Sequence, residues 1–346
     1  YITCDDILMR HCAAEVLRGT GYLQRILRPQ RTVIAIEDNK PEAIAKITAA
    51  LAPSGLKDTE IVAIPTIYPS GGEKQLIQIL TGKEVPHGQL AFDIGLFCQN
   101  VGTCVAITRA LEQDQPLISR VVSISGDNIR QPGNWEVRLG TPIRHLIELA
   151  GGYLNGDSAH LVMGGPMMGF SLAGDQVPIV KASNNILVMR EETIPHSPGY
   201  HDECIRCSKC TEVCPASLLP QQLYWHVRAR AFDRAEEFHL FDCIECGCCS
   251  AVCPSTIPLV QYYRAAKSDI RAAQKAQIKS DHARIRFESR ERRLLLKKQQ
   301  EEERRRLKRE ALQKKKAGST APTVDPVQAA LERVKARKQA AQEEST

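Results

Sequence analysis

Two stretches decide how the second half of this chain folds: Cys204-Ile-Arg-Cys207-Ser-Lys-Cys210-Thr-Glu-Val-Cys214-Pro215 and Cys243-Ile-Glu-Cys246-Gly-Cys-Cys249-Ser-Ala-Val-Cys253-Pro254. Each has the spacing C-x2-C-x2-C-x3-C followed by proline. In such a run the first three thiolates bind one [4Fe-4S] cluster, and the fourth binds the other cluster. The expected ligands are Cys204, Cys207, Cys210 and Cys253 for cluster one, and Cys243, Cys246, Cys249 and Cys214 for cluster two. The pattern therefore predicts a ferredoxin module with two [4Fe-4S] clusters over about residues 202–262.

Zinc is the alternative metal for cysteines at this density. Zinc ribbons use paired C-x2-C knuckles rather than four cysteines within eleven residues repeated twice, so the spacing favours clusters. Cys248 is an additional cysteine inside the second run, and using it as the third ligand would break the repeat. We expect small buried roles for the remaining cysteines, which lie in apolar or helical contexts: Cys4, Cys12, Cys98 and Cys104.

Composition and charge set broad limits on the protein. The 346 residues suffice for two or three domains, and the use of cysteine for clusters indicates a reducing, cytoplasmic setting. No stretch approaches the roughly 18 to 20 apolar residues that a membrane span needs, and the first residues lack the features of a signal peptide. The segment from Lys267 to Thr346 carries 23 Lys and Arg against 12 Asp and Glu, whereas the preceding residues carry 23 against 28. Nucleic acid is not expected to bind this basic tail, because Phe287 is its one aromatic residue.

The pattern upstream of the cysteines predicts two further domains. Apolar runs at 32–38 and 60–66 flank a helical period that begins at Pro41, which indicates strand, helix and strand in an α/β domain with a parallel sheet over residues 1–115. Short strands at 119–126 and 135–139, followed by a helix, indicate a small mixed α+β domain over 116–194. We expect a linker from Pro195 to His201. The tail over 267–346 is predicted as two solvated helices joined by a flexible linker, with a folded domain as the less favoured alternative.

Two glycine-containing turns are candidate phosphate sites. Tyr68-Pro-Ser-Gly-Gly-Glu-Lys-Gln75 follows the second predicted strand and enters a helix, where backbone N–H groups can meet a phosphate. Gln99-Asn-Val-Gly-Thr103 is expected to do the same after another strand. Each signal alone is weak, since most such turns only reverse the chain. Together with the cysteine module they leave a flavin or nucleotide site and an ordinary pair of turns about equally favoured.

Several motifs resemble one protein family, the C subunit of the Rnf (Rsx) electron transport complex. The motifs are Tyr1-Ile-Thr-Cys-Asp-Asp6, Ile36-Glu-Asp-Asn-Lys-Pro-Glu-Ala43, Tyr68-Pro-Ser-Gly-Gly-Glu-Lys-Gln75, Asn100-Val-Gly-Thr103, Gly164-Gly-Pro-Met-Met-Gly169, Cys243-Ile-Glu-Cys-Gly-Cys248 and Pro254-Ser-Thr-Ile-Pro-Leu-Val-Gln261. The resemblance covers residues 1 to about 270, and the segment Asp325–Lys338 looks like one of the basic, Ala-rich repeats that some members carry. That family is related to the flavin-carrying, NADH-oxidising subunit of respiratory complex I. The resemblance implies a Rossmann-like FMN domain, a soluble-ligand-binding β-grasp domain and the ferredoxin module.

The resemblance also implies site residues and a cellular role. Gly72 and Glu73 are expected near the flavin, and Gln99, Asn100 and Thr103 at its phosphate and ribityl groups. Lys74 departs from the acidic residue of the complex I relatives, so the nicotinamide contacts are less secure. In the family a Gly-rich flavin-binding segment precedes the position of Tyr1, so this chain is expected to begin downstream of it and to hold FMN poorly.

The expected role is a peripheral subunit on the cytoplasmic face of the bacterial inner membrane. With other Rnf subunits, including a ferredoxin-like one, it would pass electrons between NADH and ferredoxin while ions are moved. The alternatives are a soluble ferredoxin-like adaptor without a catalytic site of its own, and a soluble flavin dehydrogenase working alone.

Overall fold

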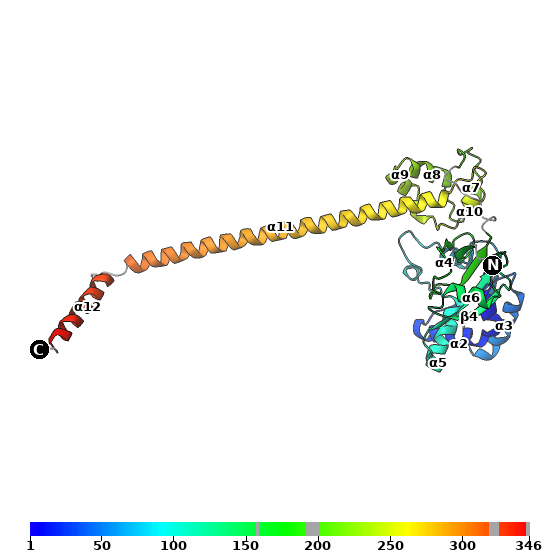
Figure 1. Cartoon of the computed structure of the whole chain (residues 1–346), viewed down its shortest axis with the longest axis horizontal. Coiled ribbons are helices and arrows are strands. Elements are labelled where there is room, and N and C mark those ends of the chain that lie inside the picture. Colours follow the sequence, from blue (N-terminus) through cyan, green and yellow to red (C-terminus); the bar gives the residue numbers. More distant parts are fainter. Residues whose placement is uncertain (157–158, 191–200, 318–324, 344–346) are drawn as a thin grey trace. The chain divides into compact units, whose positions relative to one another are not determined.

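The computed structural model describes residues 1–156, 159–190, 201–317 and 325–343 of the chain (Figure 1). The chain divides into two compact units, Tyr1–Ile270 and Arg271–Thr346. The linker expected at 195–201 lies outside the described residues except for His201. Within the described residues, no helix combines the length and the apolar composition that crossing a bilayer requires.

The first part of the larger unit is an α/β domain. Its elements are α1 (Cys4–His11), α2 (Ala13–Leu27), β1 (Thr32–Glu37), α3 (Pro41–Ser54), β2 (Thr59–Ile64), α4 (Glu73–Thr81), the 3-10 helix η1 (Ala91–Ile94) and α5 (Val101–Gln113). Strands β1 and β2 pair in parallel from Thr32 opposite Thr59 to Glu37 opposite Ile64, as the strand, helix, strand pattern predicts. One expectation was wrong: no strand precedes the turn at Gln99, because the chain reaches it from η1 through residues without regular structure.

The core of this domain forms where α2, α3 and α5 pack together with the sheet. Ile36 and Ile47 are almost fully buried there with Leu17. Helices α2 and α5 approach closely because position 19 is glycine: an added Cβ at Gly19 would lie 2.0 Å from the carbonyl oxygen of Cys104. Gly19 therefore allows α2 to lie close to α5, the helix that begins at the predicted turn around Asn100.

The second part is the mixed domain that the short strands predict. Its elements are β3 (Ser119–Ser125), β4 (Gly133–Arg138), α6 (Ile143–Leu149), β5 (His160–Met163), β6 (Phe170–Ser171) and β7 (Asn185–Met189). The strands form one sheet in the order β4-β3-β7-β5-β6, in which β3 and β7 are parallel and the other pairs antiparallel. Leu146 and Ile147 of α6 pack on Ile124 and Ile186 of the sheet.

The cysteine module is an internal repeat offset by 39 positions, Cys204 corresponding to Cys243. Its elements are α7 (Lys209–Glu212), α8 (Pro220–Arg228), α9 (Phe232–Glu237), the 3-10 helix η3 (Leu240–Asp242), α10 (Cys248–Ala251) and the start of α11 (Leu259–Ala317). Helices α7 and α10 are equivalent under this offset, and so are the starts of α8 and α11. The equivalent tyrosines Tyr224 and Tyr263 are fully buried in the core of the module.

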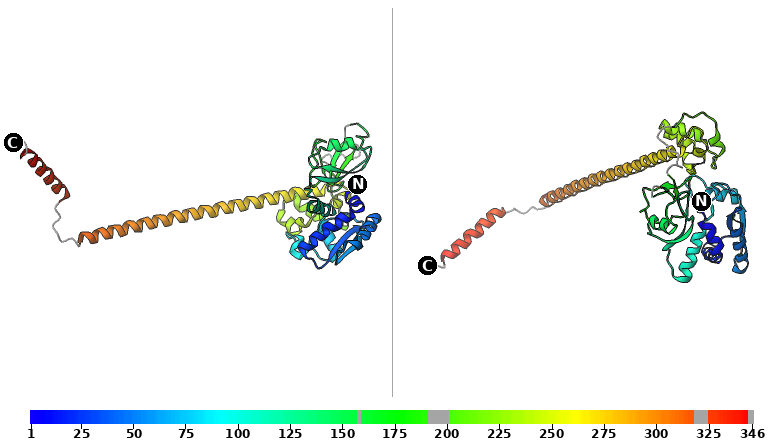
Figure 2. Two further views of the ribbon diagram at one scale, coloured as in Figure 1. Left: turned by 90° about the horizontal axis from the view of Figure 1, so that it is seen from below. Right: turned by 45° about the vertical axis from the view of Figure 1, so that its right-hand side comes forward.

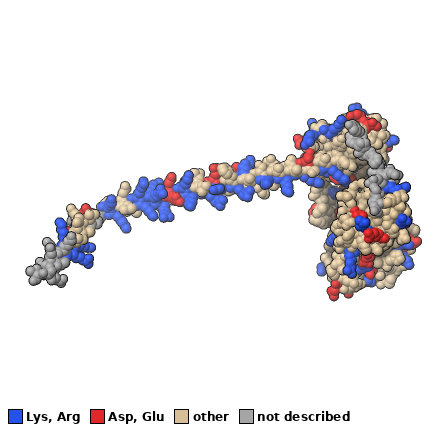
Figure 3. Space-filling model, in the orientation of Figure 1, with Lys and Arg blue, Asp and Glu red and all other residues tan. Residues whose placement is uncertain are grey.

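The basic tail consists of helices, as expected. Helix α11 is uninterrupted in both further views of the chain (Figure 2), and α12 spans Pro326–Glu343. Side chains of α11 stay buried as far as Ile270, three positions beyond Lys267, where the sequence suggested that the tail begins. Beyond Ile270 almost every described side chain is exposed, and Lys and Arg far outnumber Asp and Glu along the helix (Figure 3). The linker predicted between the two helices falls largely on residues 318–324, outside the described residues.

Candidate iron-sulfur and flavin sites

The eight predicted ligand cysteines line two separate cavities. The first cavity is lined by the thiols of Cys204, Cys207, Cys210 and Cys253. The second is lined by those of Cys214, Cys243, Cys246 and Cys249. Each cavity thus combines three cysteines of one run with the fourth of the other, which is the grouping expected from the spacing. The assignment of ligands to clusters stays a prediction, and this grouping supports it. Cys248 is not among the residues that line the second cavity.

The backbone of the two runs repeats the same unusual conformations. Arg206 and Glu245 are equivalent and have φ values of 58° and 59°, and Ser208 and Gly247 are equivalent at 64° and 88°. Left-handed residues at these positions turn the chain sharply between successive cysteines. The loops around the two cavities therefore have the same backbone conformation at these positions.

The chemistry of the cavities fits iron-sulfur clusters. Burial raises the pKa of Cys249 to about 12, and the neighbouring thiols Cys243 and Cys246 add to the shift. Four thiolates gathered in a buried site repel one another, so they need the positive charge of bound iron to remain deprotonated together. Four thiolates around one zinc ion, at about 2.3 Å from it, would lie only about 3.8 Å apart. No three Cys, His, Asp or Glu side chains among the described residues are grouped tightly enough for a single ion.

The first predicted flavin turn leads directly into α4. Gly72 is the N-cap of this helix, and Glu73 is its first residue. Ser70 is 4 % exposed, and among the described residues its Oγ is a buried side-chain atom without a hydrogen-bond partner. A Cβ added at Gly71 would meet no atom within 4 Å. An open backbone beside an unsatisfied hydroxyl at a helix N-terminus is a place where a polar group of a cofactor can bind.

The second predicted turn caps α5. Asn100 is the N-cap, and its side chain accepts a hydrogen bond from the backbone N–H of Gly102 at 2.8 Å. Its amide nitrogen donates to Asp5 Oδ2, also at 2.8 Å. Burial raises the pKa of Asp5, and the bond from Asn100 opposes that shift. Asn100 therefore joins α1 to the start of α5 and holds the first turn of that helix in place.

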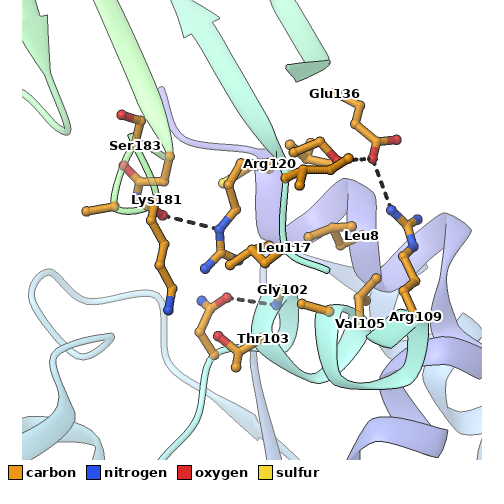
Figure 4. Close-up of a pocket in the computed structure, with 18 of the residues that line it drawn as sticks. Leu8, Gly102, Thr103, Val105, Arg109, Leu117, Arg120, Glu136, Lys181 and Ser183 are labelled. Atoms are coloured by element: carbon orange, nitrogen blue, oxygen red, sulfur yellow. Dashed lines mark hydrogen bonds and ion pairs between the residues drawn. The ribbon is translucent and has the colours of Figure 1, made fainter. Parts of the chain in front are cut away.

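A cavity of about 690 Å³ opens beside this turn (Figure 4). Asn100 and Thr103 line it together with Arg120 and Lys181, which come from the strand domain. Arg120 Nε donates to the backbone oxygen of Lys181 at 3.2 Å, so the guanidinium is held at the wall of the cavity. A helix N-terminus facing two cationic side chains favours an anionic group such as a phosphate.

The predicted flavin residues are thus distributed over two neighbouring places. Gly72, Glu73 and Gln99 do not line the cavity at α5. Burial raises the pKa of Cys98, and the charge of Glu73 raises it further, so the carboxylate of Glu73 lies near the segment that leads to Asn100. The sequence did not single out Ser70 or Asp5, although both lie inside motifs that carry the resemblance. Arg120 had no signal at all, because only the packing of the strand domain brings it to this site.

The flavin turn contacts the loop of the second cavity. Tyr68 Oη donates a 2.7 Å hydrogen bond to the backbone oxygen of Cys246. Burial raises the pKa of Tyr68 to about 12, so the hydroxyl remains a donor at neutral pH. A Cβ added at Gly247 would lie 3.2 Å from the backbone oxygen of Met167, in the Gly164–Gly169 motif. His87 Nδ1 also lies 3.2 Å from a carboxylate oxygen of Asp242.

Comparisons with known proteins agree with this architecture. Family models match residues 1–109 (Nuo51 FMN-binding domain), 121–171 (SLBB domain) and 203–257 (4Fe-4S dicluster domain). A structure titled NAD+-reducing [NiFe]-hydrogenase in the H2-reduced state shares the fold, with a TM-score of 0.50 and 14 % identity over 79 % of this chain and 57 % of that one. The chain therefore joins a domain that matches FMN-binding domains to a module that matches domains for two [4Fe-4S] clusters.

Curated relatives of one name match almost the whole chain. The chain is 49 % identical over 344 residues to the C subunit of the ion-translocating oxidoreductase complex of Pectobacterium atrosepticum, a match that covers 99 % of this chain and 48 % of that one. The proteins of the same name from Pasteurella multocida and Yersinia enterocolitica are each 52 % identical, over 98 % and 85 % of this chain and 40 % and 42 % of theirs. Over almost its whole length the chain is thus similar to these C subunits, as its motifs suggested, and it spans about half the length of these relatives or less.

Proposed function

We propose that this chain is the redox part of a peripheral subunit of a membrane complex, which couples electron transfer between NADH and ferredoxin to the movement of ions. The observation that carries the proposal is the hydrogen bond from Tyr68, in the flavin turn, to Cys246, in the second thiol cavity. It lies within the compact unit Tyr1–Ile270, which contains the FMN-binding domain and both cysteine runs. The flavin supplies two-electron hydride chemistry, and the clusters carry single electrons.

The contacts support an order for the electron path. Among the described residues, the module contacts the upstream domains at Phe241, Asp242, Cys246 and Gly247, which belong to or adjoin the second run. In the first run Cys207 is exposed. We therefore place the second cluster next to the flavin and the first cluster on the side from which electrons pass to a partner protein.

The flavin site itself is part of the proposal. Gly72 and Glu73 at the start of α4 would face the flavin ring, and Ser70 offers an unsatisfied hydroxyl beside them. Asn100 and Thr103 at the start of α5 would hold the ribityl chain and phosphate, with Gln99 preceding them. NADH would then bind over the flavin. The domain limits that we propose remain 1–115, 116–194 and 202–262, and the tail expected at 267–346 becomes exposed only after Ile270.

The complex and its ion movement come from the names of the relatives, and the membrane setting and the partners come from the resemblance of the motifs. We expect the partners to be the other Rnf subunits, including a ferredoxin-like one, at the cytoplasmic face of the inner membrane. The test is to purify the intact complex to which this protein belongs, reconstitute it in sealed vesicles and measure NADH-dependent ferredoxin reduction, the reverse reaction and the accompanying ion movement. Electron transfer without ion movement in tight vesicles would contradict the coupling.

Two simpler functions give different results. A soluble ferredoxin-like adaptor would contain both clusters but no FMN, whereas the function proposed here requires one FMN per full-length protein. A soluble flavin dehydrogenase would contain FMN but would not co-purify with membrane proteins of the complex. Measuring flavin and iron in the full-length protein, and then its co-purification from membranes, distinguishes the three.

A further inference from the structure

The two halves of the cysteine module share a backbone but not their charges. Under the 39-position offset, Lys267 on α11 is equivalent to Arg228 on α8, and Glu245 in the second run is equivalent to Arg206 in the first. The two clusters are therefore surrounded by different charges, even though their loops are built alike. A difference of this kind sets two chemically identical clusters to different potentials.

Lys267 is the most buried charge in this comparison. Its side chain is 4 % exposed, and its Nζ donates to the backbone oxygen of Cys243 at 2.6 Å and to Glu245 Oε1 at 2.9 Å. Arg264 Nε donates to the other oxygen of Glu245 at 2.8 Å. Two cations thus share one carboxylate beside a predicted ligand of the second cluster, which leaves an excess of positive charge there.

The ammonium group of Lys267 contacts the backbone of a predicted cluster ligand directly, because its Nζ lies 2.6 Å from the backbone oxygen of Cys243. A buried cation interacts strongly because the surrounding protein screens it less than water does. Reduction adds one electron to a [4Fe-4S] cluster, so a nearby cation stabilises the reduced form.

Arg228 is placed differently at the equivalent position. Its side chain is 43 % exposed, and its guanidinium pairs with the exposed carboxylate of Glu203 and with the hydroxyl of Tyr224. An ion pair that lies in solvent is screened and balanced by its own partner. The first cavity therefore lacks, at this position, the buried ammonium group that the second cavity has.

We propose that Lys267 is a positioning residue that raises the midpoint potential of the second cluster, through its hydrogen bond to the carbonyl of Cys243 and its buried charge. Cys243 belongs to the first three ligands of its run, so the proposal does not depend on which cluster the fourth cysteines bind. It also does not depend on NADH, ferredoxin or ion movement, because it concerns only the module that the family match assigns to two clusters.

The test is an EPR-monitored redox titration of the protein with both clusters in place. Lys267→Met removes the charge at similar length, Lys267→Arg keeps it, and Arg228→Met is the matched control at the equivalent position. The signal of the second cluster is identified as the one that Cys246→Ser abolishes. We expect Lys267→Met to retain iron and to lower the potential of the second cluster only, Lys267→Arg to stay near the parent, and Arg228→Met to leave the second cluster unchanged.

An unchanged second-cluster potential in Lys267→Met, or an equal shift of both clusters, would overturn the proposal. If Lys267→Met loses the second cluster, Glu245→Gln decides instead. Removing the carboxylate leaves Lys267 and Arg264 without their shared counter-charge, so the second-cluster potential should rise. A potential that falls or stays constant in Glu245→Gln, with iron content intact, would also overturn the role given to Lys267.

Discussion

Cys214 belongs to the first run, but replacing it by serine should remove the cluster of the second cavity and leave the cluster of the first cavity in place. The thiol of Cys214 lines the second cavity with Cys243, Cys246 and Cys249, although 29 positions separate it from the nearest of them. A serine hydroxyl binds iron far less well than a thiolate, because its oxygen is a harder donor and is not ionised at neutral pH. With two [4Fe-4S] clusters per chain, iron should fall from about eight to about four atoms.

The assay is iron and sulfide content together with spin quantification of the reduced protein by EPR. The signal that disappears in Cys214→Ser should be the one that Cys246→Ser also removes, and Cys253→Ser should remove the other. Cys248→Ser is the control, because Cys248 does not line the second cavity, and both clusters should remain. Loss in Cys214→Ser of the cluster held by Cys204, Cys207 and Cys210 would refute the exchange of ligands, and each run would then close on its own cluster.

Three further predictions concern other parts of the chain. Gly72→Val should lower the FMN content of the full-length protein, because the new side chain would displace the flexible end of Gln75 and fill the approach to the turn. Circular dichroism should show that the fold is intact. An unchanged FMN content would remove this turn from the flavin site. Truncation after Ile270 should leave iron content unchanged, because the buried part of α11 ends there, and any loss of clusters would contradict this. Gly19→Val should destabilise the protein by about 1–3 kcal/mol or more in denaturant unfolding, since its Cβ would lie 2.0 Å from a backbone oxygen. Gly174→Ala, where a Cβ meets no atom within 4 Å, is the control, and equal stability of the two variants would show that α2 can shift.

The cluster cysteines could be predicted because their signal is local. The three-position spacing of the first three cysteines in each run fixes which thiols turn toward one centre, and the proline after Cys214 or Cys253 fixes where the chain leaves it. The parallel strands of the first domain were predictable for a similar reason, since a β-branched run before and after one amphipathic helix has few other solutions. The family motifs then identified the FMN-binding domain.

Contacts between distant segments could not be predicted in this way. Arg120 lines the cavity beside Asn100 because Val121 of β3 packs in the core that includes α5, and Lys181 lies there because its backbone oxygen accepts a hydrogen bond from Arg120. No property of their own sequence neighbourhoods indicates this. Strand β7 pairs between β3 and β5, so its place depends on the whole sheet rather than on its own five residues. The strand expected before Gln99 failed because an apolar run there packs against α4 without pairing.

The start of the tail was hidden by its composition. Charged residues dominate the region from Lys267, which suggested solvent exposure throughout. Yet Val260, Tyr263 and Ile270 follow the three-to-four residue spacing of a helix face that packs on the module, and Lys267 lies on the same face. The spacing of these residues indicated a buried helix face, but the high charge of the segment suggested an exposed helix instead.

The sharing of thiols between the two runs bears on how the protein matures in the cell. While the chain is being synthesised, a segment that ends before Cys243 offers three thiols to the first cavity and one to the second. The second cavity has its full set only once Cys249 has emerged from the ribosome, and the first only once Cys253 has emerged. Iron and sulfide are therefore expected to be inserted after translation of the whole module. Each cluster binds cysteines from both runs, so the insertion of one cluster brings together the two runs that also bind the other.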